Sequence, residues 1–356
     1  MKFKAHIIPY ILQFKNPAGT SRGVYYQHKV WYVVLSSITD TAHIGVGECA
    51  PLPDLSCDAM PESEYLKVLQ KAIRILEDSG EIDYEYLRPY PSILFGLETA
   101  LKHFSQKSLG FWNTGFSKGE KGIEINGLIW MGNFDMMLNQ IKQKIEQGYG
   151  CIKLKIGAIN FDQELNLLKH IRQHFSSEQI TLRVDANGAF TIIDAYEKLN
   201  RLSKLDLHSI EQPIMAGKWQ EMAKLAAVTP LPIALDEELI GCNEISQKRE
   251  LLETIMPQYI ILKPSLHGGW KGCQEWIDIA SEKNIGWWIT SALESNIGLN
   301  AIAQWCAYLD VVIPQGLGTG MLYTNNIDLP LYIDGDKLRY NPIEESLNNL
   351  SAIFNV

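Results

Sequence analysis

The sequence lacks the features that mark several common protein classes. Its six cysteines lie far apart, and no two of them have the Cys-x-x-Cys spacing. We therefore expect neither a disulfide framework nor a zinc site, and free thiols are typical of a reducing compartment. The net charge is −9 and no run of Lys and Arg occurs, so nucleic-acid binding has little support.

Long apolar stretches are also missing. The N-terminal segment begins Met1-Lys2-Phe3-Lys4, and Pro9 interrupts its short apolar run, so we expect no signal peptide. No apolar stretch approaches the ~20 residues that cross a bilayer. We therefore expect no membrane association and a cytoplasmic location. The sequence does not predict whether the protein is a monomer or a homo-oligomer.

What the chain does contain is a pair of lysines on one predicted strand, within Cys151–Gly157. Residues two apart share a strand face, so Lys153 and Lys155 lie opposite Ile152 and Leu154. Strands that alternate with helices are covered on both faces, and two buried ammonium groups cost free energy unless something compensates them. Burial and mutual repulsion both lower a lysine pKa, which would produce a usable base.

Single polar residues follow at the ends of the later predicted strands. They recur every 25 to 30 residues, at Asp185, Glu211, Asp236, Lys263 and Ser291. That interval is about the length of one strand–helix unit, and in a (β/α)₈ barrel such strand ends meet on the face that carries the active site. Three converging carboxylates repel one another unless a cation lies among them, and all-oxygen ligands favour a hard ion such as Mg²⁺.

The order of predicted elements divides the chain into three parts, residues 1–120, 121–320 and 321–356. The first part predicts strands followed by helices, which is typical of a separate α+β unit. It contains a hairpin around a loop at 15–23, a third strand at 44–48, and helices at 62–77 and 93–105.

The second part predicts alternating strands and helices. The eight strands lie near positions 124, 152, 182, 209, 233, 260, 287 and 311. No clear helix follows the last strand, and the tail is expected to return to the first unit. The predicted fold class is α/β: a (β/α)₇β modified TIM barrel with an N-terminal α+β capping domain completed by the C-terminal tail.

These residues resemble the enolase superfamily, in its muconate-lactonizing subgroup. Within the subgroup the chain most resembles the o-succinylbenzoate synthase family of menaquinone biosynthesis, and the resemblance covers nearly the whole chain. Besides the lysines and the three carboxylates, it is carried by Gly47–Pro53, Asp185–Phe190, Glu211–Pro213, Leu235–Glu237, Lys263–Ser265 and Ser291–Ser295.

The resemblance implies a syn dehydration of a succinyl-hydroxycyclohexadiene-carboxylate to o-succinylbenzoate, with a metal-stabilised enediolate. Lys155 would remove the proton α to the carboxylate and return a proton to the departing hydroxyl. Lys153 would lower the pKa of Lys155, and Lys263 would stabilise the intermediate from the opposite side. Mg²⁺, with Mn²⁺ as a possible substitute, would be bound by Asp185, Glu211 and Asp236.

The resemblance also implies the surroundings of the site. Asn187 and Glu237 would orient the metal ligands, with a solvated Glu237 as the alternative. The loops 15–23 and 47–58 would cover the mouth of the barrel and contact the succinyl group. The substrate, a small-molecule carboxylate, would be held by Ser291, Gly318 and Thr319.

Other interpretations of these residues stay open. A Lys-x-Lys alone is typical of a solvated strand face, and an Asp at a strand end is typical of a helix N-cap. The regular spacing and the shared strand face favour a common site instead. Two other functions are an N-succinyl or N-acylamino acid racemase or dipeptide epimerase, and a non-catalytic barrel that binds a carboxylate. The Asp-x-Asp of dipeptide epimerases is missing at 315–320, which counts against that substrate class.

Overall fold

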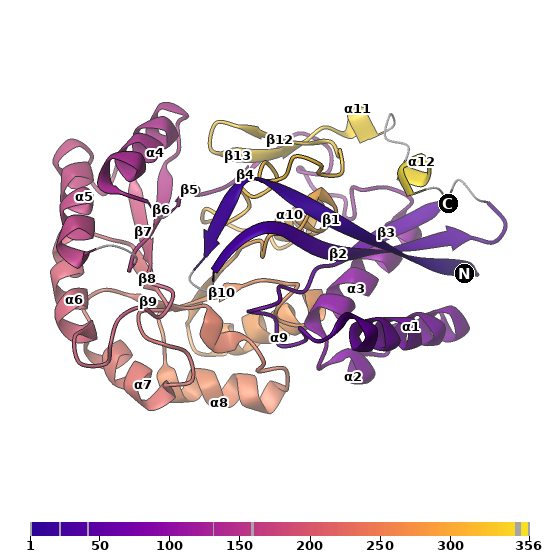
Figure 1. The fold of residues 1–356 in the computed structure, drawn as a ribbon, viewed down its shortest axis with the longest axis horizontal. Helices are drawn as coiled ribbons and strands as arrows, with labels where there is room; N and C mark the ends of the chain where they lie inside the picture. Colours follow the sequence, from indigo (N-terminus) through magenta and orange to yellow (C-terminus); the bar gives the residue numbers. More distant parts are fainter. Residues whose placement is uncertain are drawn as a thin grey trace.

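The structure is a computed structural model that describes residues 2–20, 23–40, 43–130, 132–157, 160–345 and 350–354. It contains an antiparallel sheet covered by helices and a curved parallel sheet with helices around its outside (Figure 1). This arrangement confirms the predicted fold class of a TIM-like barrel with an α+β cap. In the described part of the chain, no helix is both long and apolar enough to cross a membrane.

The cap is a three-stranded antiparallel sheet with three helices. Its strands, in the order β1-β2-β3, are β1 (Phe3–Thr20), β2 (Gly23–Ser37) and β3 (Ile44–Cys49). Its helices are α1 (Glu62–Ser79), α2 (Tyr84–Leu87) and α3 (Pro91–Gln106).

The expected loop at 15–23 is wrong, because β1 continues to Thr20 and β2 begins at Gly23. The pairing shifts register between Gln13 and Ala18. Pro17 lies in this irregular stretch and has no N–H to donate, so the ladder resumes only beyond it. Residues 21 and 22, near the end of the expected loop, lie outside the described residues.

Strand β3 packs closely against helix α3 of the cap. A Cβ on Gly47 would lie 1.9 Å from the carbonyl oxygen of Gly96 in α3, and a Cβ on Gly45 would lie 2.3 Å from that of Ala100. Only glycine therefore permits this close approach of helix and strand. Glu48 is on the opposite strand face, which is directed at the barrel.

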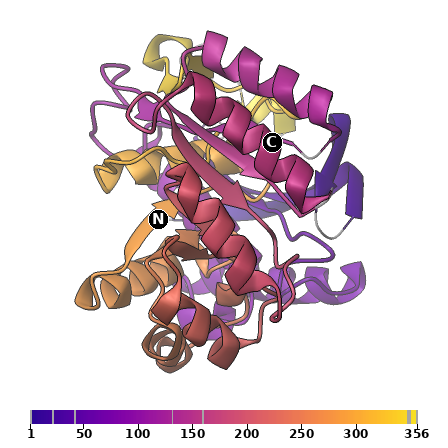
Figure 2. The ribbon, with the colours of Figure 1, turned by 90° about the vertical axis from the view of Figure 1, so that its left-hand side faces the viewer.

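The barrel sheet is parallel and has seven strands in sequential order. They are β5 (Gly127–Ile129), β6 (Cys151–Lys155), β7 (Thr181–Asp185), β8 (Ser209–Glu211), β9 (Ile233–Leu235), β10 (Tyr259–Leu262) and β11 (Gly286–Ile289). Figure 2 shows helices stacked along the outer side of these strands. The helices are α4 (Phe134–Glu146), α5 (Phe161–His174), α6 (Ala195–Leu202), α7 (Trp219–Val228), α8 (Ile245–Ile255), α9 (Gly269–Glu282) and α10 (Asn296–Tyr308). Two short 3₁₀ helices, η1 (Ser203–Leu205) and η2 (Glu237–Leu239), complete the unit.

The barrel closes through isolated bridges. Gln315 makes a parallel bridge to Ile125, and Gly316 makes one to Thr290. The predicted eighth strand near 311 is therefore misplaced by about four residues. Pro314 lacks a backbone N–H, and the ladder contacts begin only after it.

The predicted first strand near 124 is also misplaced. Residues Ile123–Glu124 form β4, which belongs to a separate antiparallel sheet, and the first parallel strand begins at Gly127. The partners of β4 come from the tail, as β12 (Leu331–Asp334) and β13 (Lys337–Tyr340), in the order β12-β13-β4.

Other parts of the tail contact the cap. Tyr323 bridges Phe14 of β1, and the ring of Phe354 lies 5.1 Å from that of Tyr32 in β2. The tail also forms the short helices α11 (Pro342–Glu345) and α12 (Leu350–Phe354). The division of the chain into three units stays a prediction.

Candidate active site

A cavity of about 390 Å³ lies at the carboxyl ends of the parallel strands. This volume is within the range of small-molecule sites. Its wall includes every residue that the sequence predicts for the site. These are Lys153, Lys155, Asp185, Asn187, Glu211, Asp236, Glu237, Lys263, Ser291, Gly318 and Thr319.

Strand register explains how three of these residues come to lie side by side. Lys155 is paired with Asp185 across β6 and β7, and Asp185 is paired with Glu211 across β7 and β8. Side chains that share a row and a face of a sheet are neighbours. Ile152 and Leu154 point the other way and are fully buried against the outer helices, as the alternation predicts.

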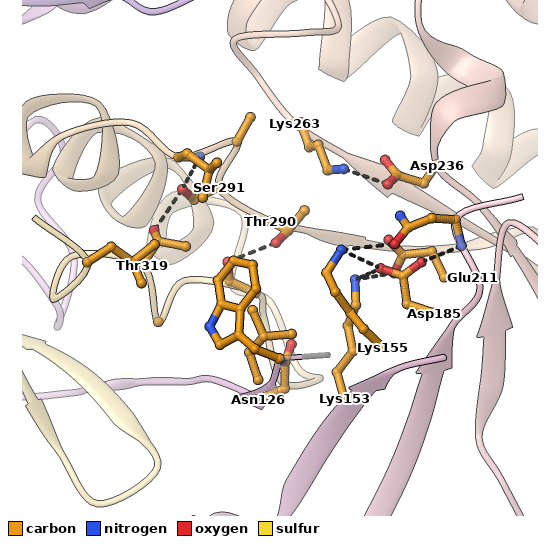
Figure 3. A pocket seen from close by; sticks show the side chains of 18 of the residues that line it. Asn126, Lys153, Lys155, Asp185, Glu211, Asp236, Lys263, Thr290, Ser291 and Thr319 are labelled. Atoms are coloured by element: carbon orange, nitrogen blue, oxygen red, sulfur yellow. Dashed lines mark hydrogen bonds and ion pairs between the residues drawn. The ribbon is translucent and has the colours of Figure 1, made fainter. Parts of the chain in front are cut away.

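The lysines are paired with carboxylates on two sides of the cavity (Figure 3). Lys153 Nζ lies 2.5 Å from Glu211 Oε2 and 3.0 Å from Asp185 Oδ2. Lys263 Nζ lies 2.5 Å from Asp236 Oδ2. Lys153 lies on β6 and Lys263 directly follows β10. Three strands of the curved sheet separate β6 from β10, so Lys263 reaches the cavity from another wall.

Lys155 has a different environment from the other two lysines. Its Nζ donates a hydrogen bond of 2.9 Å to Asn187 Oδ1 and lies 3.7 Å from Asp185 Oδ2. Asn187 in turn donates from Nδ2 to Glu237 Oε1 at 2.9 Å. Asn187 therefore links the amine of Lys155 to a carboxylate on a neighbouring loop.

The expected lowering of the lysine pKa is wrong for Lys153. Burial alone would lower the pKa of Lys153, but the charges of Asp185 and Glu211 outweigh burial and raise it. The pKa of Lys263 is raised in the same way by Asp236. The sequence shows the burial and mutual repulsion of the lysines, but it does not show that carboxylates lie within ion-pair distance and raise the pKa.

The carboxylates retain oxygen atoms that no protein group satisfies. Within the described residues, Glu211 Oε1, Asp236 Oδ1 and Glu237 Oε2 are buried without a hydrogen-bond partner. Burial and the charge of Asp185 raise the pKa of Glu211, and burial and Asp236 raise the pKa of Glu237 to about 7. Buried oxygens without a partner are costly, and a cation would satisfy them and relieve the repulsion.

The three proposed metal ligands do not converge on one point in this structure. Among the residues described, no group of three or more His, Cys, Asp or Glu side chains has the arrangement of a metal site, because lysines lie between the carboxylates. The chemistry of the donors, three carboxylates of which Glu211 and Asp236 each have an oxygen without a partner, nevertheless fits a hard divalent cation.

Strained backbone positions lie next to the site residues. Asn187, Gln212 and Leu293 have φ of 44°, 37° and 68°, a region that residues other than glycine rarely adopt. Such positions persist where surrounding contacts hold them, and they cluster at functional sites. Gln212 Oε1 accepts from the backbone N–H of Asp236 at 3.2 Å, so this side chain holds the loop that carries a site carboxylate.

The opposite wall of the cavity is formed by hydroxyls and by the cap. Thr319 Oγ1 donates to Ser291 Oγ at 2.7 Å, a contact visible in Figure 3. From the cap, Leu52 and Leu55 line the cavity beside Tyr25 of β2. The expected second lid loop, 47–58, is shorter than predicted because β3 extends through Cys49.

Sequence reasoning missed a buried cation beneath the cavity. Arg183 is 2% exposed, donates to the carbonyl of Pro314 at 2.9 Å and lies 4.2 Å from the ring of Trp288, which lines the cavity. Arg183 is two residues before Asp185 on the same strand. The alternation that predicted Asp185 therefore also places Arg183 inside the barrel, although only the strand ends were considered.

Comparison with known proteins identifies the family of this fold and site. The family described as Enolase C-terminal domain-like matches residues 136–330. An o-succinylbenzoate synthase from Desulfotalea psychrophila is 46% identical, over 92% of this chain and 96% of that protein. A crystal structure of MenC from Desulfotalea psychrophila has a TM-score of 0.82 and 41% identity, covering 95% of this chain and 100% of that one.

Relatives with other activities are more distant. An N-succinylamino acid racemase from Thermus thermophilus is 32% identical over 45% of this chain and 41% of that protein. The L-Ala-D/L-Glu epimerase from Bacillus subtilis has a TM-score of 0.81 at 19% identity, over 96% of this chain and 97% of that one, which is a likeness of fold alone. The family match and the long, high-identity relative agree, and the chain belongs to the enolase superfamily.

Proposed function

We propose that the protein is an o-succinylbenzoate synthase, which dehydrates a succinyl-hydroxycyclohexadiene-carboxylate in menaquinone biosynthesis. The observation that carries this proposal is the 46% identity along almost the full length of both chains to a protein of that name. The lysines and carboxylates around one cavity support it. The substrate is a small-molecule carboxylate.

We propose that Asp185, Glu211 and Asp236 hold Mg²⁺, with Mn²⁺ as a substitute. Members of the enolase superfamily generally use Mg²⁺, and the buried oxygens without partners on Glu211 and Asp236 support its binding here. Bound there, the ion would supply positive charge against the dianion that forms when a proton leaves the carbon next to a carboxylate.

We assign the proton transfers to Lys155. Its neutral amine takes the proton from the carbon α to the substrate carboxylate, which leaves an enediolate. The electron pair of the enediolate then forms the ring double bond as the C–O bond to the hydroxyl breaks. The same Lys155, now an ammonium, gives its proton to the departing hydroxyl, which leaves as water. One base on one face suffices for this syn elimination.

In this proposal, the other polar residues position Lys155 and the substrate or stabilise the charge that develops on the substrate. Asn187 holds the Nζ of Lys155 through its 2.9 Å hydrogen bond, and its second bond to Glu237 fixes the orientation of the amide. Lys153 and Lys263 contribute positive charge from two sides, which stabilises the developing dianion. Gly318 and Thr319 contact the substrate on the far wall, where Ser291 Oγ accepts the hydroxyl proton of Thr319.

A second candidate is racemisation of N-succinyl amino acids. Lys155 and Lys263 reach the cavity from different walls, which is the arrangement needed for one lysine to remove a proton and another to return it to the opposite face. The racemase relative matches less than half of this chain, so we place this activity second.

The experiment that tests the proposal is an assay of the purified protein with Mg²⁺ and the succinyl-hydroxycyclohexadiene-carboxylate. Formation of o-succinylbenzoate, followed by chromatography, is the expected result, with Asp236→Asn as the inactive control. N-succinyl amino acids are assayed in parallel for α-proton exchange in D₂O. Exchange with these compounds and no o-succinylbenzoate from the diene would overturn the proposal in favour of the racemase.

A further inference from the structure

A buried carboxylate lies directly behind the hydroxyl wall of the cavity. Glu294 is fully buried and both of its oxygens accept hydrogen bonds. Oε2 accepts from Ser291 Oγ and from the backbone N–H of Ala292, each at 2.7 Å. Oε1 accepts from Ser265 Oγ. Glu294 therefore ties the end of β11 to the loop that follows Lys263.

The loop that carries Glu294 is held from several sides. Leu293, with its φ of 68°, donates from its backbone N–H to Ser291 Oγ at 3.2 Å. Its carbonyl accepts from Tyr323 Oη at 2.6 Å and lies 3.0 Å from His28 Nδ1. This backbone is overdetermined by its contacts, so the direction of the Ser291–Glu294 hydrogen bond is fixed by the fold.

The direction of each hydrogen bond in this chain determines which hydroxyl of the wall can donate a proton to a substrate. A serine hydroxyl has one proton, and Ser291 gives it to Glu294. Ser291 Oγ therefore accepts the proton of Thr319, 2.7 Å away. An ionised carboxylate has no proton of its own to give, so the order of donors runs from Thr319 through Ser291 to Glu294.

The two hydroxyls differ in how easily they can turn toward an anion. Ser291 is 7% exposed, and withdrawing its proton would remove a donor from a fully buried carboxylate, which is costly. Thr319 is only half-buried and can redirect its proton from Ser291 to a ligand in the cavity. Losing the bond between two neutral hydroxyls costs less than losing one to a carboxylate.

We propose that Glu294 is a positioning residue that binds the proton of Ser291, so that Thr319 is the hydroxyl that donates to the substrate. The inference rests on the proposed function, because the group that Thr319 meets is an anionic or carbonyl oxygen of the succinyl-bearing substrate. Ser291, which the sequence predicts as a substrate contact, acts here as an acceptor.

The first test compares Thr319→Val with Ser291→Ala, using the KM for the diene and the Kd for o-succinylbenzoate from calorimetry. Thr319→Val removes the donor, and we expect both constants to rise about tenfold, as for one hydrogen bond to a charged group. Ser291→Ala releases the proton of Thr319, and we expect both constants to stay within about twofold. A larger rise for Ser291→Ala than for Thr319→Val, with both proteins folded, would overturn the proposal.

The second test concerns Glu294 itself. In Glu294→Gln the amide oxygen can still accept from Ser291 and Ala292 while the NH₂ faces Ser265, so KM is expected to stay near that of the wild type. In Glu294→Met the proton of Ser291 is released and can serve the ligand, so Thr319→Val should now raise KM less than about threefold. Equal effects of Thr319→Val with and without Glu294→Met would contradict coupling through Ser291.

Glu48→Gln is the matched control for folding. At the start of α10, Glu48 accepts from Ser295 N at 2.8 Å and from Gly298 N at 2.9 Å. Among the described residues, neither Ser291 nor Thr319 is a hydrogen-bond partner of Glu48. The melting temperature of Glu48→Gln is expected to fall, while its KM for the diene stays unchanged. If the wild type does not turn over the diene, the proposed function fails, and the same variants are compared by α-proton exchange of N-succinyl amino acids, where Thr319→Val should again raise KM more than Ser291→Ala.

Discussion

Two groups of buried carboxylates differ in how their oxygens are satisfied. The first group, at the barrel mouth, comprises Asp185, Glu211 and Asp236, which are 1%, 3% and 1% exposed. The second group lies where the cap meets the barrel or directly behind the cavity wall. It comprises Glu48, Glu98 and Glu294, which are 0%, 6% and 0% exposed.

In the second group, neutral N–H and O–H donors satisfy both oxygens of each carboxylate. Glu98, on α3 of the cap, accepts from the backbone N–H groups of Trp270 and Lys271 at 2.5 and 3.2 Å. Glu48, on β3, accepts from Ser295 and Gly298 at the start of α10. Each cap carboxylate thus meets the positive end of a barrel helix, α9 or α10, where a carboxylate is favoured.

In the mouth group, lysines are the main partners and some oxygens have none among the described residues. The two groups are equally buried, but the hydrogen bonds of the second group are complete and those of the mouth group are not, which indicates different roles. A carboxylate whose hydrogen bonds are complete holds the structure together. At the barrel mouth, the buried oxygens of Glu211 and Asp236 that have no partner in the described residues indicate a partner that the protein alone does not provide.

The largest effect that this comparison predicts is at the mouth. Lys155→Ala should abolish α-proton exchange and lower turnover by about 10²–10⁴-fold, the usual contribution of a general base. Steady-state kinetics and exchange in D₂O measure it. Retention of exchange would mean that another group is the base.

Lys263→Arg sharpens this result. Arginine keeps the positive charge but does not act as an acid near neutral pH. We expect measurable dehydration and no racemisation of N-succinyl amino acids. Dehydration as low as in Lys155→Ala, with an unchanged fold, would show that Lys263 also transfers a proton.

Removal of divalent ions is the next test. With EDTA, dehydration should fall at least about a hundredfold, because no cation then balances the dianion, and added Mg²⁺ should restore it. Mn²⁺ is expected to restore it in part. Full activity in a sample verified as metal-free by elemental analysis would be incompatible with this proposal.

The second group of carboxylates should affect stability instead. Glu48→Gln turns at least one accepting oxygen into a donor that faces other donors, and we expect a loss of about 1–3 kcal/mol in the free energy of unfolding. Urea titration in EDTA measures it. Glu211→Gln, which leaves Lys153 paired with Asp185, is the control and should lose less. The opposite order would break the comparison.

A smaller effect is expected from pH. Burial outweighs the two backbone N–H donors and raises the pKa of Glu98 to about 8 in the folded protein, above its ordinary value of about 4.3. Between these values the folded protein keeps a proton that the unfolded chain has released. The stability that Glu98 contributes is therefore complete below about pH 4.3 and is lost as the pH rises to about 8.

The measurement is the difference in unfolding free energy between the wild type and Glu98→Gln, which cannot titrate. That difference should fall by on the order of 1–3 kcal/mol between pH 5 and pH 8 and then level off. A difference that is flat or rises with pH would show that Glu98 is ionised throughout this range in the folded protein.

The two groups of carboxylates also differ in whether the sequence predicts them. Alternation within one strand and the spacing of strand ends predict the mouth residues, because each depends on local periodicity and on the barrel geometry. Arg183 was predictable by the same alternation. In the described residues the eighth strand forms no ladder, and the isolated bridges of Gln315 and Gly316 mark its position, so it could be misplaced by a few residues.

The second group was beyond prediction for a different physical reason. The contact of Glu48 with Ser295 joins residues 247 positions apart, and that of Glu98 with Trp270 joins residues 172 apart. Both depend on how the cap docks on the barrel, which no local pattern encodes. The contact of Glu294 with Ser291 is local, but it depends on the positive φ of Leu293, which residues other than glycine rarely adopt.

Binding of Mn²⁺, followed by its electron paramagnetic resonance signal in the absence of substrate, tests the central claim most directly. The wild type, Glu48→Gln and Glu98→Gln are predicted to bind one ion with similar affinity. Glu211→Gln and Asp236→Asn are predicted to bind it at least about tenfold more weakly, because each loses a charged ligand. Unchanged affinity in Glu211→Gln and Asp236→Asn, or a comparable loss in Glu48→Gln, would contradict the assignment of the bare carboxylate oxygens to a cation site.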